Sequence, residues 1–200
     1  MRKYAILLIL VIMSTMVLFG CVAPAATADE RDTDVVVITF DFAKQSGYAS
    51  NQFAVWIEDA NGNFVKTLYA TKFTAKGGYE KRPDSIPVWV ERSGLAGMKD
   101  IDAITGATPK SGALRYTWDL TNETGARVPD GTYKFFVEGT LRWKNTVLFS
   151  GEIVLNDSAS SVEATAEYAY SDSAEQQALT AESPENTMLG NVRASYRPAN

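Results

Sequence analysis

The chain has 200 residues, of which 19 are basic, 24 are acidic, one is cysteine and none is histidine. Without histidine, a Ser-His-Asp or Cys-His nucleophile and a histidine-ligated zinc or haem are excluded, and the net charge of −5 argues against nucleic-acid binding. A redox function would therefore require an organic cofactor.

The N-terminus is typical of a bacterial lipoprotein signal peptide. A short positive start precedes the apolar stretch 5–19, which is shorter than a membrane-spanning helix. Leu18-Phe19-Gly20-Cys21 resembles a lipobox, although Phe19 departs from the small or β-branched residue usual there. The resemblance implies that Cys21 becomes the first mature residue and carries the lipid. The alternative is a conventional signal peptide that is cleaved near residues 23–26.

These features predict three parts: a signal peptide at residues 1–20, a lipidated tether at 21–33 and one folded domain at 34–200. Removing residues 1–20 takes away two basic residues and no acidic ones, which leaves 17 basic and 24 acidic residues and a net charge of −7. A lipidated Cys21 also leaves no thiol for a disulfide, a redox pair or a metal site.

The domain is predicted to be mainly β, because its strong segments are rich in β-branched and aromatic residues and are bounded by turns. We expect an antiparallel immunoglobulin-like β-sandwich. The expected strands lie at residues 35–42, 53–57, 64–69, 114–118, 132–138, 147–155 and 162–170, with a closing strand at 189–196 and a mobile loop at 171–186.

Two turns support the strand assignment. Asp59-Ala60-Asn61-Gly62-Asn63 and Pro129-Asp130-Gly131 each place turn-forming residues beside predicted strands. The first turn, Asp59-x-Asn61-x-Asn63, also has the ligand spacing of a calcium loop, but Phe64 stands where such a loop needs glycine. We therefore expect no metal site. Between these turns, residues 74–112 are rich in Gly and Pro and predict a long irregular loop insertion, a feature that is often functional.

The insertion contains Asp102-Ala103-Ile104-Thr105-Gly106-Ala107-Thr108. This run resembles the acceptor motif Asp-x-x-Ser/Thr-Gly-Ala/Ser-Thr, to which a flavin transferase attaches FMN through a threonine phosphoester. The alternative is an ordinary surface loop, because small turn-forming residues are common in loops.

The resemblance implies a role for each motif residue. Thr108 would hold the FMN phosphate covalently, and Asp102 would help the transferase and its Mg²⁺ engage the site. Gly106 and Ala107 would keep the loop slim. Thr105 offers a second hydroxyl in the same loop, and only the resemblance distinguishes it from Thr108.

Other side chains could assist a bound flavin. The aromatic candidates to cover its ring system are Trp89, Tyr116, Trp118 and Trp143, for which the alternative is a place in the core. Lys110 and Arg115 could offset the phosphate charge, or could simply be solvated.

The mature chain as a whole resembles the periplasmic family named domain of unknown function 2271. The resemblance is carried by residues 53–68, 102–108, 118–119 and 128–133. Residues 118–137 also resemble the immunoglobulin-like module of flagellar hook-capping proteins. The first family implies a location outside the cytoplasm, often beside flavin transferases and membrane-bound reductases, but no established activity.

Two functions follow. The first is a lipid-anchored extracytoplasmic protein that carries FMN on Thr108 and relays electrons between a membrane-bound reductase and an extracytoplasmic acceptor. It would be an electron carrier more than a stand-alone enzyme, and its partners would include the flavin transferase. The second is a cofactor-free immunoglobulin-like binding or assembly module in which residues 74–112 form a recognition loop.

Replacing Cys21 tests the lipobox. Cys21→Ser should leave a longer precursor without lipid, because lipid transfer requires the thiol. The measurement is incorporation of labelled palmitate together with the mass of the processed chain. Palmitate that persists on the Cys21→Ser variant would contradict the assignment.

Overall fold

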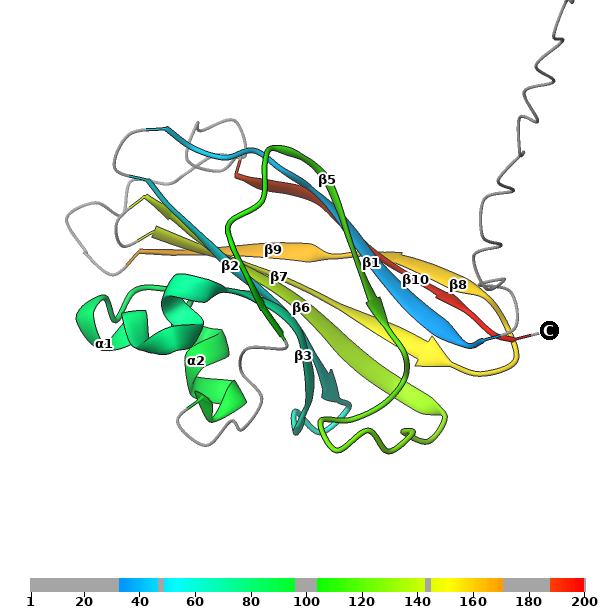
Figure 1. Cartoon of the computed structure of the whole chain (residues 1–200). Coiled ribbons are helices and arrows are strands. Elements are labelled where there is room, and N and C mark those ends of the chain that lie inside the picture. Colours follow the sequence, from blue (N-terminus) through cyan, green and yellow to red (C-terminus); the bar gives the residue numbers. More distant parts are fainter. Residues whose placement is uncertain (1–32, 47–48, 96–103, 143–144, 171–187, 200) are drawn as a thin grey trace, which may run out of the picture. The chain divides into compact units, whose positions relative to one another are not determined.

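The structure is a computed structural model, and it describes residues 33–46, 49–95, 104–142, 145–170 and 188–199. Two β-sheets account for most of these residues (Figure 1). The expectation of a mainly β domain is therefore confirmed, whereas its immunoglobulin-like topology stays a prediction. Cys21, Asp102, Trp143 and the loop expected at 171–186 lie outside the described residues.

The smaller sheet has four strands, all paired antiparallel. Its order is β5 (Gly112–Trp118), β1 (Val35–Phe42), β10 (Leu189–Arg197) and β8 (Ser160–Glu163). The larger sheet has six, in the order β4 (Thr105–Gly106), β3 (Phe64–Thr71), β2 (Ala49–Asp59), β6 (Gly131–Arg142), β7 (Asn145–Leu155) and β9 (Thr165–Tyr170). Only the pairing of β4 with β3 is parallel.

The core between the sheets follows from the alternation of apolar residues along the strands. In β1, Val36, Ile38, Phe40 and Phe42 are buried, and the residues between them are more exposed. Side chains from both sheets join one apolar cluster, and the rings of Phe40 and Phe53 meet edge to face with centroids 5.6 Å apart. Where only one face of a strand is buried, as in β1, this alternation fixes the strand register.

The turn at Asp59 is built as its sequence predicts. The Asp59 carboxylate accepts hydrogen bonds from the backbone N–H groups of Asn61 and Asn63, both at 2.9 Å, and from the Asn63 side chain at 2.8 Å. Gly62 supplies the positive φ of 85° that the tight connection requires. The hydrogen bonds from Asn63 lower the pKa of Asp59 below its ordinary value. This carboxylate stabilises the hairpin.

The expectation of a long irregular loop at 74–112 is wrong for its first part, which is helical. It contains η2 (Thr74–Gly78), a helical turn with a kink at Lys76 and Gly77, then α1 (Tyr79–Lys81) and α2 (Pro87–Ser93). These helices pack on the outer face of the larger sheet around a second apolar cluster (Figure 1). The cluster consists of Ala54, Trp56, Ala70, Ala75, Ile86, Trp89, Leu95 and Phe136.

Proline and glycine misled the expectation because they lie at the ends of α2. Pro87 occupies the first turn, where its missing N–H costs nothing, and Gly94 closes the helix in the left-handed conformation. Ile86 precedes the helix with φ of 45°, a strained value for a β-branched residue. Its complete burial and the hydrogen bond from its N–H to Thr140 Oγ1, at 2.7 Å, stabilise that conformation.

Of the two strands expected near the C-terminus, one needs correction and the other is confirmed. Residues 162–170 are divided between β8 and β9, which belong to different sheets and are separated at Ala164. Residues 189–196 do form a strand, β10, but it lies between β1 and β8. The chain thus passes from one sheet to the other within a segment that sequence alone reads as continuous.

The second cluster predicts the effect of removing Trp89. This side chain is fully buried, and its indole N–H donates to Thr67 Oγ1 at 3.0 Å. Trp89→Ala should lower the free energy of unfolding by about 3–5 kcal/mol, as large cavities in cores do. Urea denaturation measures this, with Glu91→Ala as the control on the exposed side of the same helix. Equal stability of the two variants would contradict the packing described here.

Candidate functional site

The motif residues lie where the chain passes from the larger sheet to the smaller one. Thr105 and Gly106 form β4 and pair with Ala70 and Thr71 at the edge of the larger sheet. Residues 107–111, here called the crossing segment, then lead to β5 at the edge of the smaller sheet; this is the green stretch before β5 in Figure 1. Thr108 is therefore held on a segment whose two ends are fixed in different sheets.

Tyr69 of β3 supports the start of the crossing segment. Its hydroxyl donates to the carbonyl oxygen of Ala107 at 2.9 Å. Gly106 approaches its ring so closely that an added Cβ would lie 2.7 Å from Cε2 and 3.1 Å from the hydroxyl oxygen. A larger residue at position 106 would force the Tyr69 ring to shift, so this close contact favours the glycine of the motif.

Tyr69 belongs to an aromatic group between the sheets. Its ring lies 5.0 Å from that of Phe53 and 4.9 Å from that of Tyr116, and the Tyr116 ring stacks on Phe40 at 5.8 Å. We call Tyr69 and Tyr116 the tyrosine pair. Burial raises the pKa of both hydroxyls above the ordinary value for tyrosine, so both are neutral phenols at physiological pH.

The connection between β1 and β2 supports the other end of the crossing segment. The backbone N–H of Lys44 donates to Ser111 Oγ at 2.9 Å. Asn51, which is buried with φ of 52°, accepts from the backbone N–H of Gln45 at 2.7 Å and donates to its carbonyl at 2.9 Å. This connection therefore has an ordered backbone where it meets Ser111.

The two motif threonines have different surroundings. Thr105 is a strand residue in register with Ala70, and its side chain is half-buried. Thr108 is also half-buried, but it lies outside any strand and directly after Ala107, which is exposed. The structure thus brings Thr105, Gly106, Ala107 and Thr108 together beside Tyr69.

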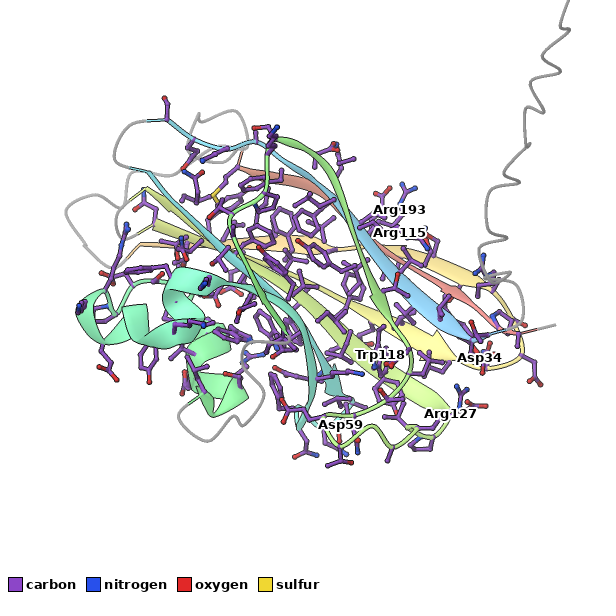
Figure 2. The ribbon with its side chains drawn as sticks, viewed as in Figure 1. Asp34, Asp59, Arg115, Trp118, Arg127 and Arg193 are labelled. Atoms are coloured by element: carbon purple, nitrogen blue, oxygen red, sulfur yellow. The ribbon has the colours of Figure 1, made fainter. Side chains whose placement is uncertain are left out.

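Of the aromatic candidates, Tyr116 contacts Tyr69, and it is Tyr69 that contacts the motif at Gly106 and Ala107. Trp89 and Trp118 are fully buried, and the indole of Trp118 donates to the carbonyl of Thr121 at 2.8 Å. Both tryptophans are core residues and are unable to cover a surface-bound ring. Trp118 lies between the sheets in Figure 2, near the far end of β5.

The two candidate cations also differ in position. Lys110 is exposed within the crossing segment. Arg115 is exposed on β5, opposite Thr39 of β1, which on its other side faces Arg193 of β10. Figure 2 shows these two arginines near one another. Because Arg115 alternates with the inward-facing Tyr116, it is placed on the outer face of the smaller sheet and away from Tyr69.

Tyr69, Lys44 and Ser111 were not among the residues that the sequence singled out for this site. Their contacts join positions that are 38 and 67 residues apart, so no local pattern marks them. From sequence alone, an aromatic residue in a predicted strand, such as Tyr69, is expected to be a core residue. Its place beside the motif follows only from the pairing of β4 with β3.

A second polar group, formed by two buried glutamates, lies beneath α2. Glu138, which is fully buried, accepts hydrogen bonds from the N–H groups of Val88 at 3.1 Å and Trp89 at 2.7 Å. Glu58 accepts from Trp56 Nε1 at 2.8 Å and from Arg92 at 3.1 Å. These carboxylates bind the helical insertion to the sheet, and sequence reasoning missed both.

Two hollows on the described surface lie elsewhere. The larger, of about 730 Å³, lies beside α2 and is lined by Arg92, Lys134, Phe136 and Glu152 among others. The smaller, of about 400 Å³, lies near Thr39, Glu163 and Arg193. No residue of β4 or of the crossing segment lines either one.

Comparison with known proteins identifies one family. A family model described as "Predicted periplasmic protein (DUF2271)" matches residues 34–171, a stretch that contains β1 to β9 and the whole motif. No curated protein and no solved structure matches the chain. Within the part of the chain that the structure describes, no helix is long and apolar enough to cross a membrane.

Glu138 predicts a pH dependence of stability. Burial raises its pKa from 4.5 to about 7, although the two backbone donors and Arg92 favour the ionised form. Between these values the unfolded chain has released a proton that the folded chain retains, so stability should fall as pH rises from about 4.5 to 7. The fall from this group is on the order of 3 kcal/mol, at about 1.4 kcal/mol per pKa unit.

Glu138→Gln should flatten this dependence, because glutamine does not titrate. Thermal or urea denaturation at a series of pH values from 4.5 to 8 is the measurement. Glu152→Gln, at an exposed position of β7 in the same sheet, is the control and should keep the wild-type slope, since it leaves Glu138 in place. The assignment is contradicted when Glu138→Gln and wild type have the same slope.

Proposed function

We propose, starting from the fact that the chain belongs to the DUF2271 family of predicted periplasmic proteins, that it is a lipid-anchored electron carrier with FMN on Thr108. It would relay electrons between a membrane-bound reductase and an acceptor outside the cytoplasm. The anchor would be Cys21, followed by the tether at 21–33 and a domain of the immunoglobulin-like sandwich type.

The observation that carries this proposal is the position of Thr108 on the ordered crossing segment. Thr108 follows an exposed residue on a segment fixed at both ends, and it lies two residues after a glycine in close contact with the Tyr69 ring. A transferase must reach a hydroxyl and bind the backbone around it, and a slim segment at the edge of a sheet allows both.

The attachment chemistry requires an activated donor. In the proposed step the Thr108 oxygen bonds to the FMN phosphorus of flavin adenine dinucleotide, the pyrophosphate P–O bond breaks, and AMP leaves. The hydroxyl proton passes to a base on the transferase. Asp102 would help the transferase and its Mg²⁺ engage the motif. The domain itself needs no catalytic base, which agrees with a chain that has no histidine.

The residues present fit a covalently held flavin better than a reversibly bound one. The motif residues line neither of the two hollows described above. A phosphoester makes such a pocket unnecessary, because the cofactor is not lost by dilution outside the cytoplasm. When bound, the flavin supplies the electron chemistry, and the domain supplies its position.

Thr108→Val tests the proposal directly. The wild type, exported together with a flavin transferase, should show flavin fluorescence that survives denaturing electrophoresis. Thr108→Val should abolish it, because the change keeps β-branching and volume and removes the nucleophilic oxygen. Intact-mass measurement gives the size of the adduct, and fragmentation gives its position.

Variants at the neighbouring positions serve as controls. Thr105→Ser should retain the label, and Asp102→Ala should reduce it. A labelled Thr108→Val variant, or a wild type that stays unlabelled beside an active transferase, would overturn the flavin proposal. A cofactor-free binding or assembly module would then be the better account of the domain.

A further inference from the structure

We propose that Tyr69 is the positioning residue for Thr108, holding the crossing segment in the form that the transferase binds. The effect of Tyr69 on flavin attachment rests on the proposed function, whereas its contacts with Gly106 and Ala107 are independent of any flavin. The hydroxyl of Tyr69 donates to the Ala107 carbonyl, and its ring lies against Gly106. Both contacts fall within two residues of Thr108.

The pairing of β4 with β3 is too short to fix the crossing segment by itself, so another contact is needed to position Thr108. β4 has two residues, which face Ala70 and Thr71, and the crossing segment begins immediately afterwards. So short a parallel pair fixes few backbone groups and would fray at its end. The hydrogen bond from Tyr69 extends the constraint by one residue beyond the strand, to the peptide group that joins Ala107 to Thr108.

The Tyr69 ring is itself well fixed, which makes its hydroxyl a useful anchor. It stacks on Phe53 with an interplanar angle of 27° and contacts Tyr116 at 4.9 Å. Phe53 is fully buried in the core shared by the two sheets. A side chain packed in this way loses little further conformational entropy when it makes a hydrogen bond, so the bond orders the crossing segment efficiently.

The orientation of the Ala107 carbonyl matters because the peptide unit is planar. Fixing that oxygen fixes the plane of the bond that leads into Thr108, and so limits the directions in which the Thr108 side chain points. With this anchor in place, a larger fraction of the protein molecules has the backbone form that the transferase binds. Loss of the anchor lowers that fraction and weakens apparent binding by the same factor.

Tyr69→Phe isolates the hydroxyl from the ring. The ring contacts with Phe53, Tyr116 and Gly106 remain, and only the hydrogen bond is lost. Tyr116→Phe is the matched control, because Tyr116 is half-buried in the same aromatic group and none of its contacts among the described residues is a hydrogen bond to the crossing segment. Both variants should keep the wild-type thermal midpoint to within a few degrees.

The first measurement needs no transferase. Amide hydrogen exchange over residues 104–111, followed by mass spectrometry, should be about five-fold faster in Tyr69→Phe than in the wild type, the usual scale for one hydrogen bond. It should be unchanged in Tyr116→Phe. Equal exchange in wild type and Tyr69→Phe, or equal acceleration in both variants, would overturn the positioning role.

The second measurement uses the flavin transferase with flavin adenine dinucleotide and the folded protein as substrate. Tyr69→Phe should raise KM for the protein about five-fold and leave kcat unchanged, because a smaller competent fraction affects binding and not the chemical step. Tyr116→Phe should match the wild type. An unchanged KM for Tyr69→Phe, or a fall in kcat alone, would overturn the inference.

The two measurements also separate this inference from the proposed function. Faster exchange in Tyr69→Phe with a wild type that is never labelled would support Tyr69 as the anchor of the crossing segment and overturn the flavin acceptor. A labelled wild type with unchanged exchange and KM in Tyr69→Phe would support the acceptor and overturn the role of Tyr69.

Discussion

The central strands of the larger sheet, β2 and β6, are buried on both faces, and this constraint determines much of the rest of the structure. Phe53, Val55 and Ile57 point into the core between the sheets, whereas Ala54 and Trp56 point to the other side. A sheet with two apolar faces needs a cover on each of them. The smaller sheet covers one face, and the helical insertion covers the other.

The insertion also determines where the motif lies. It leaves the end of β3, packs across the outer face, and returns as β4 parallel to β3. Neighbouring parallel strands require a long crossover connection of this kind. The polar groups of the sheet secure it: Glu138 binds the start of α2, and Thr140 accepts the N–H of Ile86 and donates to the carbonyl of Asp84. The position of Thr108 is thus a consequence of how the outer face is covered.

Sequence predicted the parts of the fold in which local pattern and burial agree. β1 alternates cleanly, and the turn at Asp59 carries its own capping groups, so both were predictable. The insertion was not, because Pro87 and Gly94 resemble loop residues until the helix between them is known. The break at Ala164 escaped prediction because no glycine or proline marks the point where β8 ends and β9 begins in the other sheet. Tyr69 escaped it because its partners are distant in the chain.

The crossing segment has one further consequence, which concerns the order of events after export. Its anchors come from β3, from the connection between β1 and β2, and from the start of β5, so it depends on both sheets. Such long-range contacts form late, because the chain must first bring distant strands together. The segment takes its ordered form only on a domain that has completed folding. An enzyme that recognises that form would distinguish finished protein from folding intermediates.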